Sequence, residues 1–133
     1  MSVFDSDPRL VPAPLRVAAP LFERFGRSSH AVEAHPWHAQ TTLPVLALFV
    51  AMQDGFVDGW MDWGSLDPDA LLAASREVDP EDVGFLLELL EISSAFYAFL
   101  GDVGEVPLAT ADRIHARLAE LAAGLGPRYA EAA

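Results

Sequence analysis

A cluster of imidazole and carboxylate groups in the first third of the chain could bind a metal ion. It consists of His30, Glu33, His35 and His38. Imidazole nitrogens and carboxylate oxygens are the ligands that zinc and similar divalent metals accept. Helical metal motifs place two histidines at i and i+4, whereas these histidines are spaced by five and three residues. Two hypotheses therefore remain for this segment: a metal site wrapped by a loop, and a polar loop whose imidazoles hydrogen-bond to backbone groups.

A second group of side chains combines acids with large aromatic rings. Asp54, Asp58 and Asp62 are spaced four residues apart. On a continuous helix they form one stripe, and like charges at that spacing destabilise a helix by roughly 0.2–0.5 kcal/mol per pair. The aromatic residues beside them are Phe56, Trp60 and Trp63. Aromatic anchors next to charges are typical of binding hot spots, so this pattern predicts a surface for a cationic partner. The alternative is that the rings belong to the core and the aspartates form a solvated face.

Two further carboxylates, Glu88 and Glu91, lie one helical turn apart in an otherwise apolar segment. Together with Asp58 and Asp62 they could form a site for Mg²⁺ or Mn²⁺ inside a helical bundle. Bundles of that kind carry a second Glu-x-x-Glu, Glu-x-x-Asp or Glu-x-x-His motif, which this sequence lacks. The alternative is that both glutamates mark the exposed stripe of their helix.

The sequence offers no template for nucleophilic or phosphate-transfer chemistry. It has no cysteine, no serine in a Gly-x-Ser-x-Gly context and no glycine-rich phosphate loop. An apolar ligand pocket between helices is a further hypothesis, with Phe85, Phe96, Tyr97 and Phe99 as its lining. The same four rings are equally consistent with a filled core.

Prolines and glycines divide the chain into secondary-structure elements. These elements would have to position the candidate histidines, carboxylates and aromatic rings. Prolines within the first twenty residues predict an extended arm, and Asp67 followed by Pro68 predicts a capped helix start. Gly101 and Gly124 predict helix ends. We therefore predict an all-α fold, a compact bundle of about five helices in a single domain of residues 1–133. The predicted elements are an extended proline-rich arm over 1–20, a short helix over 21–26, and main helices over 43–61, 68–77, 80–100 and 110–123.

The segment from Val83 to Leu100 is apolar on nearly every side. A helix with this pattern is surrounded by other elements, so we predict that it lies at the centre of the bundle. Five modest helices must cover all of its large side chains, which also leads us to expect a homodimer.

The net charge of −12 comes from one segment. Residues 54–105 hold thirteen acids and the single base Arg76, whereas acids and arginines balance over 1–53 and 106–133. This disfavours nucleic acid and anionic membrane surfaces as partners, because both are bound through Lys and Arg. The longest apolar run, Leu43 to Met52, is ten residues, and a bilayer span needs about 20. The lack of cysteine and of a signal-peptide pattern predicts a cytoplasmic location.

These observations favour a non-catalytic protein-interaction module, of the inhibitor, antitoxin, immunity or adaptor type. We expect it to bind a basic protein surface through Asp54–Asp62 and the neighbouring aromatics. The alternative is a small metal-dependent enzyme or ligand-binding bundle that uses the histidine cluster or the carboxylates. The sequence requires no cofactor, and a divalent metal is compatible with it. Catalysis is less favoured because the histidines and carboxylates do not have the spacings of known catalytic or metal-binding motifs. The concentration of acids in residues 54–105, by contrast, follows directly from counting charged residues.

Overall fold

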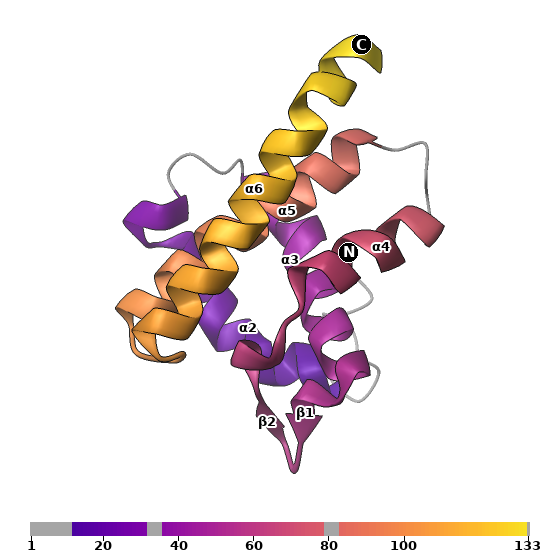
Figure 1. The fold of residues 1–133 in the computed structure, drawn as a ribbon. Helices are drawn as coiled ribbons and strands as arrows, with labels where there is room; N and C mark the ends of the chain where they lie inside the picture. The colour runs from indigo at the N-terminus through magenta and orange to yellow at the C-terminus, as the bar shows by residue number, and fades with distance from the viewer. Residues whose placement is uncertain (1–11, 32–35, 79–82, 133) are drawn as a thin grey trace.

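The computed structural model of the protein describes residues 12–31, 36–78 and 83–132. The helices are α2 (Ala13–Gly26), α3 (Pro36–Val50), α4 (Pro68–Val78), α5 (Val83–Asp102) and α6 (Leu108–Ala132) (Figure 1). A short π-helical turn, Ala51–Gly55, in which Gln53 and Asp54 depart from helical angles, leads from α3 into an antiparallel hairpin of strands β1 (Phe56–Val57) and β2 (Trp60–Met61). Short 3₁₀ turns lie at Ser29–Ala31 and Trp63–Ser65. The all-α prediction is confirmed, and the two-stranded hairpin is the only sheet within the described ranges.

Helix α5 lies at the centre, as its all-round apolar pattern predicts. It packs against α3, α4 and α6 and against the turn Ser29–Ala31. The α5 side chains buried by these neighbours include Leu86, Leu89, Leu90, Ile92, Phe96, Tyr97 and Leu100. Because one chain covers them, the reason for expecting a homodimer no longer applies, and the homodimer stays a prediction.

Helix α5 is also long and apolar enough to cross a membrane by length and composition, over Gly84–Asp102. Within the fold, 56% of that stretch is buried against other elements. A core helix passes the same test, and the packing of α5 is that of a core helix.

Helices α5 and α6 form an antiparallel pair joined by a short connection (Figure 1). A Cβ added at Gly101 would lie 2.9 Å from the Cβ of Ala111 on α6. Glycine at this position therefore allows the two helices to approach closely. Gly101 does not end α5: the helix predicted to end at residue 100 ends two residues later, at Asp102, and the positive φ of 79° falls at Gly104.

A polar link ties α5 to α6 inside this pair. The hydroxyl of Ser94 donates to the backbone oxygen of His115 at 3.1 Å. The Nδ1 atom of His115 lies 2.8 Å from the backbone oxygen of Ser94, at which it acts as the donor. Each residue thus satisfies the other where the helices meet, which gives His115 a structural role.

Helix α2 corrects the predicted arm over 1–20 and the short helix over 21–26. Pro14 lies in the first turn, where no intrahelical donor is needed, and Pro20 lies inside the helix. Ala18 and Phe25 are fully buried on the inner face of α2. The stabilisation from packing this face exceeds the stabilisation that is lost because Pro20 has no amide proton for a helical hydrogen bond. Residues 1–11 of the predicted arm lie outside the described residues.

Helix α3 corrects both ends of the predicted helix over 43–61. It begins at Pro36, so that Pro44 lies inside the helix rather than in its first turn. It ends at Val50, because the chain beyond that residue enters the π-helical turn and the hairpin. Leu43, Leu46 and Val50 are buried in the core.

Helix α4 begins as predicted, with Asp67 as its cap and Pro68 as its first residue. The Oδ1 atom of Asp67 accepts hydrogen bonds from the backbone amides of Asp69 at 3.1 Å and Ala70 at 3.4 Å. Asp69 in turn binds Arg117 of α6 through two hydrogen bonds, from Nε at 3.0 Å and from Nη2 at 2.6 Å. This bidentate pair joins α4 to α6 at the surface.

Helix α6 is longer than the predicted helix over 110–123 at both ends. Its core positions are as expected, with Ile114, Leu118 and Leu125 buried. Gly124 does not end the helix, which continues to Ala132. A glycine lowers helix stability by about 1 kcal/mol but adopts helical angles, and the buried side chains of Ala122 and Leu125 on either side of it hold the helix against the core.

Candidate functional site

The acidic and aromatic residues between Asp54 and Trp63 lie on a hairpin, not on a continuous helix. Val57 and Trp60 face each other across the two strands, with Asp58 and Gly59 as the turn. The φ angles of these two turn residues are 53° and 77°. Left-handed angles at both positions define the type I′ turn, for which Asp-Gly is a preferred pair. The four-residue spacing of the aspartates therefore does not make a helical stripe, and that prediction is wrong.

The base of the hairpin is fixed by a tight contact at Gly55. A Cβ at this position would lie 2.6 Å from both Cγ1 and the backbone oxygen of Val50. The backbone amide of Asp62 donates to the oxygen of Gly55 at 2.7 Å, which closes the hairpin. Asp54, immediately before it, has a left-handed φ of 64°. These constraints hold the strands in one direction relative to α3.

The hairpin presents apolar side chains to solvent beside its acids. The exposed fractions are 81% for Met52, 57% for Val57 and 62% for Trp60. Asp54, Asp58 and Asp62 are also exposed. Val57 and Trp60 are paired across the two strands, so these two exposed apolar side chains lie together, and grouped apolar side chains mark interaction surfaces. We call these six residues the hairpin surface.

The three aromatic residues predicted as anchors have different environments. Trp60 is exposed and Phe56 is half-buried, whereas Trp63 is buried, with 3% of its surface accessible. The Trp63 ring lies 5.2 Å from that of Phe96 and 6.2 Å from that of Phe22. The structure therefore leaves Trp60 as an accessible anchor and makes Trp63 part of the core.

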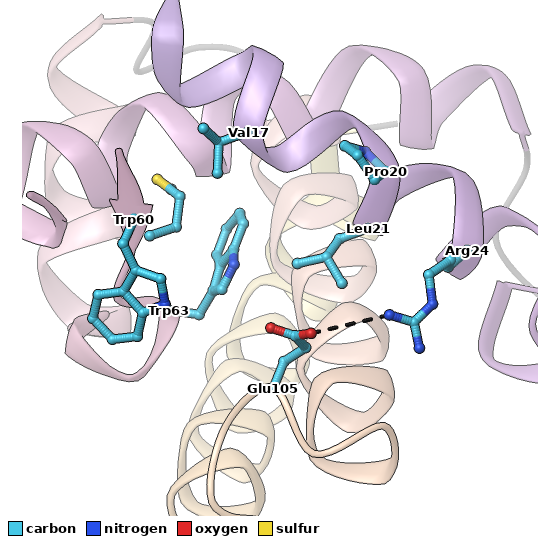
Figure 2. A pocket seen from close by; sticks show the side chains of 8 residues that line it. Val17, Pro20, Leu21, Arg24, Trp60, Trp63 and Glu105 are labelled. Atoms are coloured by element: carbon cyan, nitrogen blue, oxygen red, sulfur yellow. Dashed lines mark ion pairs between the residues drawn. The ribbon is translucent and has the colours of Figure 1, made fainter. Parts of the chain in front are cut away.

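A groove runs between the hairpin and helix α2. Figure 2 shows Trp60 and Trp63 on one side and Leu21 and Arg24 on the other, with the carboxylate of Glu105 between them. The volume of the groove is about 240 Å³. Its walls come from α2, from the hairpin region and from the connection between α5 and α6. Segments far apart in the sequence therefore meet at this groove.

One ion pair crosses the groove. Nη1 of Arg24 lies 4.0 Å from Oε1 of Glu105, and about half of each side chain is exposed. The guanidinium carbon of Arg24 also lies 5.9 Å from the centre of the Phe99 ring. An exposed pair at this distance is weak, since water screens it and both side chains stay mobile.

The aromatic residues predicted to line a ligand pocket fill the core instead. Phe96, Tyr97 and Phe99 are buried, and Phe85 is half-buried. The Phe96 ring packs edge-to-face on Phe25, with 5.4 Å between ring centres. Such contacts occupy the space that a ligand would need.

The histidine cluster lies largely beyond the described part of the chain. Glu33 and His35, and the side chain of His38, are outside it. The remaining member, His30, has its Nε2 atom 2.5 Å from Oδ2 of Asp102, and its ring lies against Phe99. His30 therefore ties the turn Ser29–Ala31 to the end of α5, and the metal hypothesis for the whole cluster stays a prediction.

The carboxylate hypothesis finds no support among the residues that the structure describes. In that part of the chain, no three histidine, aspartate or glutamate side chains are placed to hold one metal ion. Asp58 and Asp62 lie in the exposed hairpin region, whereas Glu88 and Glu91 lie on α5, where Glu91 is exposed. The structure does not assemble these four residues into a site.

Comparisons of the chain with protein-family models, curated proteins and solved structures give no match.

Several groove residues are not found by reasoning from the sequence. Leu21 and Arg24 fall within the predicted short helix over 21–26, which carries no functional signal. Glu105 lies in a loop and has no neighbouring motif. The spacing of Leu15, Phe22 and Phe25 could have indicated that α2 is an amphipathic helix, and hence that some of its residues face a neighbouring element.

Proposed function

We propose that the protein is a non-catalytic interaction module whose hairpin surface binds a basic protein partner. The observation that carries this proposal is the 62% exposure of Trp60 on a hairpin with constrained backbone. Tryptophan is the residue type most enriched in binding hot spots, and a rigid backbone lowers the entropy lost on binding. An exposed indole without a partner is unfavourable in water, so a partner that covers it gains hydrophobic free energy.

The charge of the hairpin surface supports a basic partner. Asp54, Asp58 and Asp62 are exposed, and within residues 54–105 the only base is Arg76. Acidic charges around an aromatic anchor speed the encounter with a basic surface and disfavour acidic competitors. The aspartates would thus set selectivity and salt dependence, and the apolar side chains would supply affinity. The module type (inhibitor, antitoxin, immunity protein or adaptor) is part of this proposal.

The test begins with a photo-crosslinking residue in place of Val57, which is exposed and does not line the groove. The same residue in place of Ala119, exposed on α6, is the control. We expect position 57, and not position 119, to capture one basic partner in the native host. The partner is then purified, and its affinity is measured at low and high ionic strength.

Two variants test whether the captured partner binds to the hairpin surface. Trp60→Ala removes the anchor, and we expect at least about a tenfold loss of affinity, the scale of a hot-spot residue. Asp54→Asn with Asp58→Asn removes two charges, and asparagine tolerates the left-handed angles of both positions. We expect this double variant to bind more weakly at low salt and to lose most of its salt dependence. Unchanged affinity in both variants would refute the proposed function.

A further inference from the structure

The groove between α2 and the hairpin combines an apolar lining with one accessible carboxylate. The apolar walls come from Val17 and Leu21 on α2 and from Trp60 across the groove. Glu105 supplies the carboxylate, which points into the groove from the connection between α5 and α6 (Figure 2). The occupant that fits must therefore present an apolar stem and a positively charged head.

The size of the groove points to a side chain rather than to a whole small-molecule ligand. Its volume is about 240 Å³, whereas pockets for drug-sized ligands hold roughly 300–1,000 Å³. Its open form, between a helix and a hairpin, also suits a chain segment that passes along the surface. A residue of a protein partner meets both conditions.

Arginine matches the two features of the groove better than other side chains do. Its methylene stem packs on apolar surface while the charged head stays accessible. Its planar guanidinium stacks on an indole ring and pairs with a carboxylate. Trp60 offers the exposed indole, and Glu105 offers the carboxylate.

The groove already contains an internal competitor for this carboxylate. Arg24 approaches Glu105 only to 4.0 Å, and both side chains are about half exposed. A pair of this kind is weak, so Glu105 can accept a second cation or exchange Arg24 for it. The charge of Arg24 opposes an incoming arginine, which makes Arg24 a residue that limits affinity.

We propose that the groove lined by Leu21, Trp60 and Glu105 binds an arginine side chain from the protein partner. The guanidinium lies between the Trp60 indole and the Glu105 carboxylate, and the stem packs against Leu21. This inference rests on the proposed function, and it names the residue type that the hairpin surface and its groove recognise.

The experiment titrates the ¹⁵N-labelled full chain with acetyl-Gly-Arg-Gly-amide and follows the indole N–H signals by NMR. The signals are assigned with Trp60→Phe and Trp63→Phe. We expect saturable shifts of the Trp60 and Trp63 indole signals, and a much weaker response to the same peptide with citrulline, which lacks the charge. Equal shifts with both peptides, or no shift at these indoles, would overturn the inference.

Two pairs of matched variants test how the charges of Glu105 and Arg24 contribute to peptide binding. Glu105→Gln should weaken peptide binding at least about three-fold, whereas Glu91→Gln, the same change at an exposed glutamate on α5, should not. Arg24→Gln should strengthen binding about two-fold because it removes the competitor, and Arg27→Gln, beyond the end of α2, should leave binding unchanged. A gain of affinity cannot come from misfolding. Identical behaviour within each pair would contradict the inference.

The outcomes separate this inference from the proposed function. If the double asparagine variant weakens the captured partner and Glu105→Gln does not, the hairpin surface binds a partner without an arginine in the groove. The inference then fails and the proposed function stands. If the peptide binds as expected but neither Trp60→Ala nor the double asparagine variant changes the affinity of the captured partner, the groove stands as an arginine site and the proposed function fails.

Discussion

The hydroxyl of Tyr97 donates a hydrogen bond to the backbone oxygen of Trp63 at 2.6 Å. Tyr97 lies on α5 in the centre of the fold, and Trp63 begins the short turn that follows the hairpin. Both residues are buried. This bond therefore anchors the chain after the hairpin to the central helix, and it links the position of the hairpin surface to the core.

Removal of this hydrogen bond should destabilise the fold. Tyr97→Phe keeps the ring but leaves the backbone oxygen of Trp63 with only the longer hydrogen bond from the backbone amide of Leu66, at 3.4 Å. We expect the free energy of unfolding to fall by about 0.5–1.5 kcal/mol, the range for the loss of one intramolecular hydrogen bond. Urea denaturation measures this, and an unchanged m-value shows that the variant buries the same surface. A loss near zero would mean that water replaces the hydroxyl.

Tyr97 should also make the fold sensitive to high pH. Burial, with a smaller contribution from the negative charge of Asp62, raises the pKa of Tyr97 well above its usual 10.0. Between pH 10 and the raised pKa of the folded state, the unfolded chain releases the phenol proton while the folded chain keeps it. The free energy of unfolding therefore falls as pH rises, by at most about 1.4 kcal/mol per unit, and the full stability is present below pH 10. In urea denaturation across this range, Tyr97→Phe should show a shallower decline than the wild type. Parallel declines would contradict the prediction.

The pair between Asp69 and Arg117 should be visible in the titration of Asp69. The hydrogen bonds from Arg117 hold the pKa of the Asp69 carboxyl below its usual 3.8. The stabilisation from this pair is present above that value and is lost as pH falls through the lower pKa of the folded state. Carboxyl ¹³C NMR should show the Asp69 pKa returning toward 3.8 in Arg117→Gln.

Glu120→Gln is the matched control for this titration. Glu120 accepts from Nη1 of Arg117, an atom that does not bond to Asp69. The pKa of Asp69 should therefore stay low in this variant. If both substitutions raise it equally, the bidentate geometry is not the cause.

Three glycines should respond differently to alanine because their backbones differ. Gly59 has a φ of 77°, so Gly59→Ala should destabilise the fold by about 1–2 kcal/mol. Gly55→Ala should cost more, since the new Cβ would meet the backbone oxygen of Val50 at 2.6 Å. Gly124 is helical with open space around it, so Gly124→Ala should stabilise by about 0.5–1 kcal/mol. Thermal unfolding checks this order, and stabilisation by Gly59→Ala would show that the I′ turn is absent in solution.

Local signals in the sequence determined several elements of this protein. Asp67 and Pro68 specify the start of α4 because a side-chain cap and a fixed φ act within one turn. The apolar pattern from Val83 to Leu100 specifies a central helix, because no other position buries a helix on every side. The hairpin turn is also encoded locally, in Asp58-Gly59. The prediction of a continuous helix over 43–61 did not take this turn pair into account.

Only the tertiary structure decided which of these residues can meet a partner. Trp60 and Trp63 are three residues apart and identical in type, yet one is exposed and the other is buried beside Phe96. Their difference depends on the position of α5, whose Phe96 and Tyr97 contact Trp63, and that position is set by contacts between distant segments. The groove has the same origin, since it brings Glu105 next to Arg24 across 81 positions of the chain. Burial and charge pairing of this kind arise from packing, and packing has no local signature.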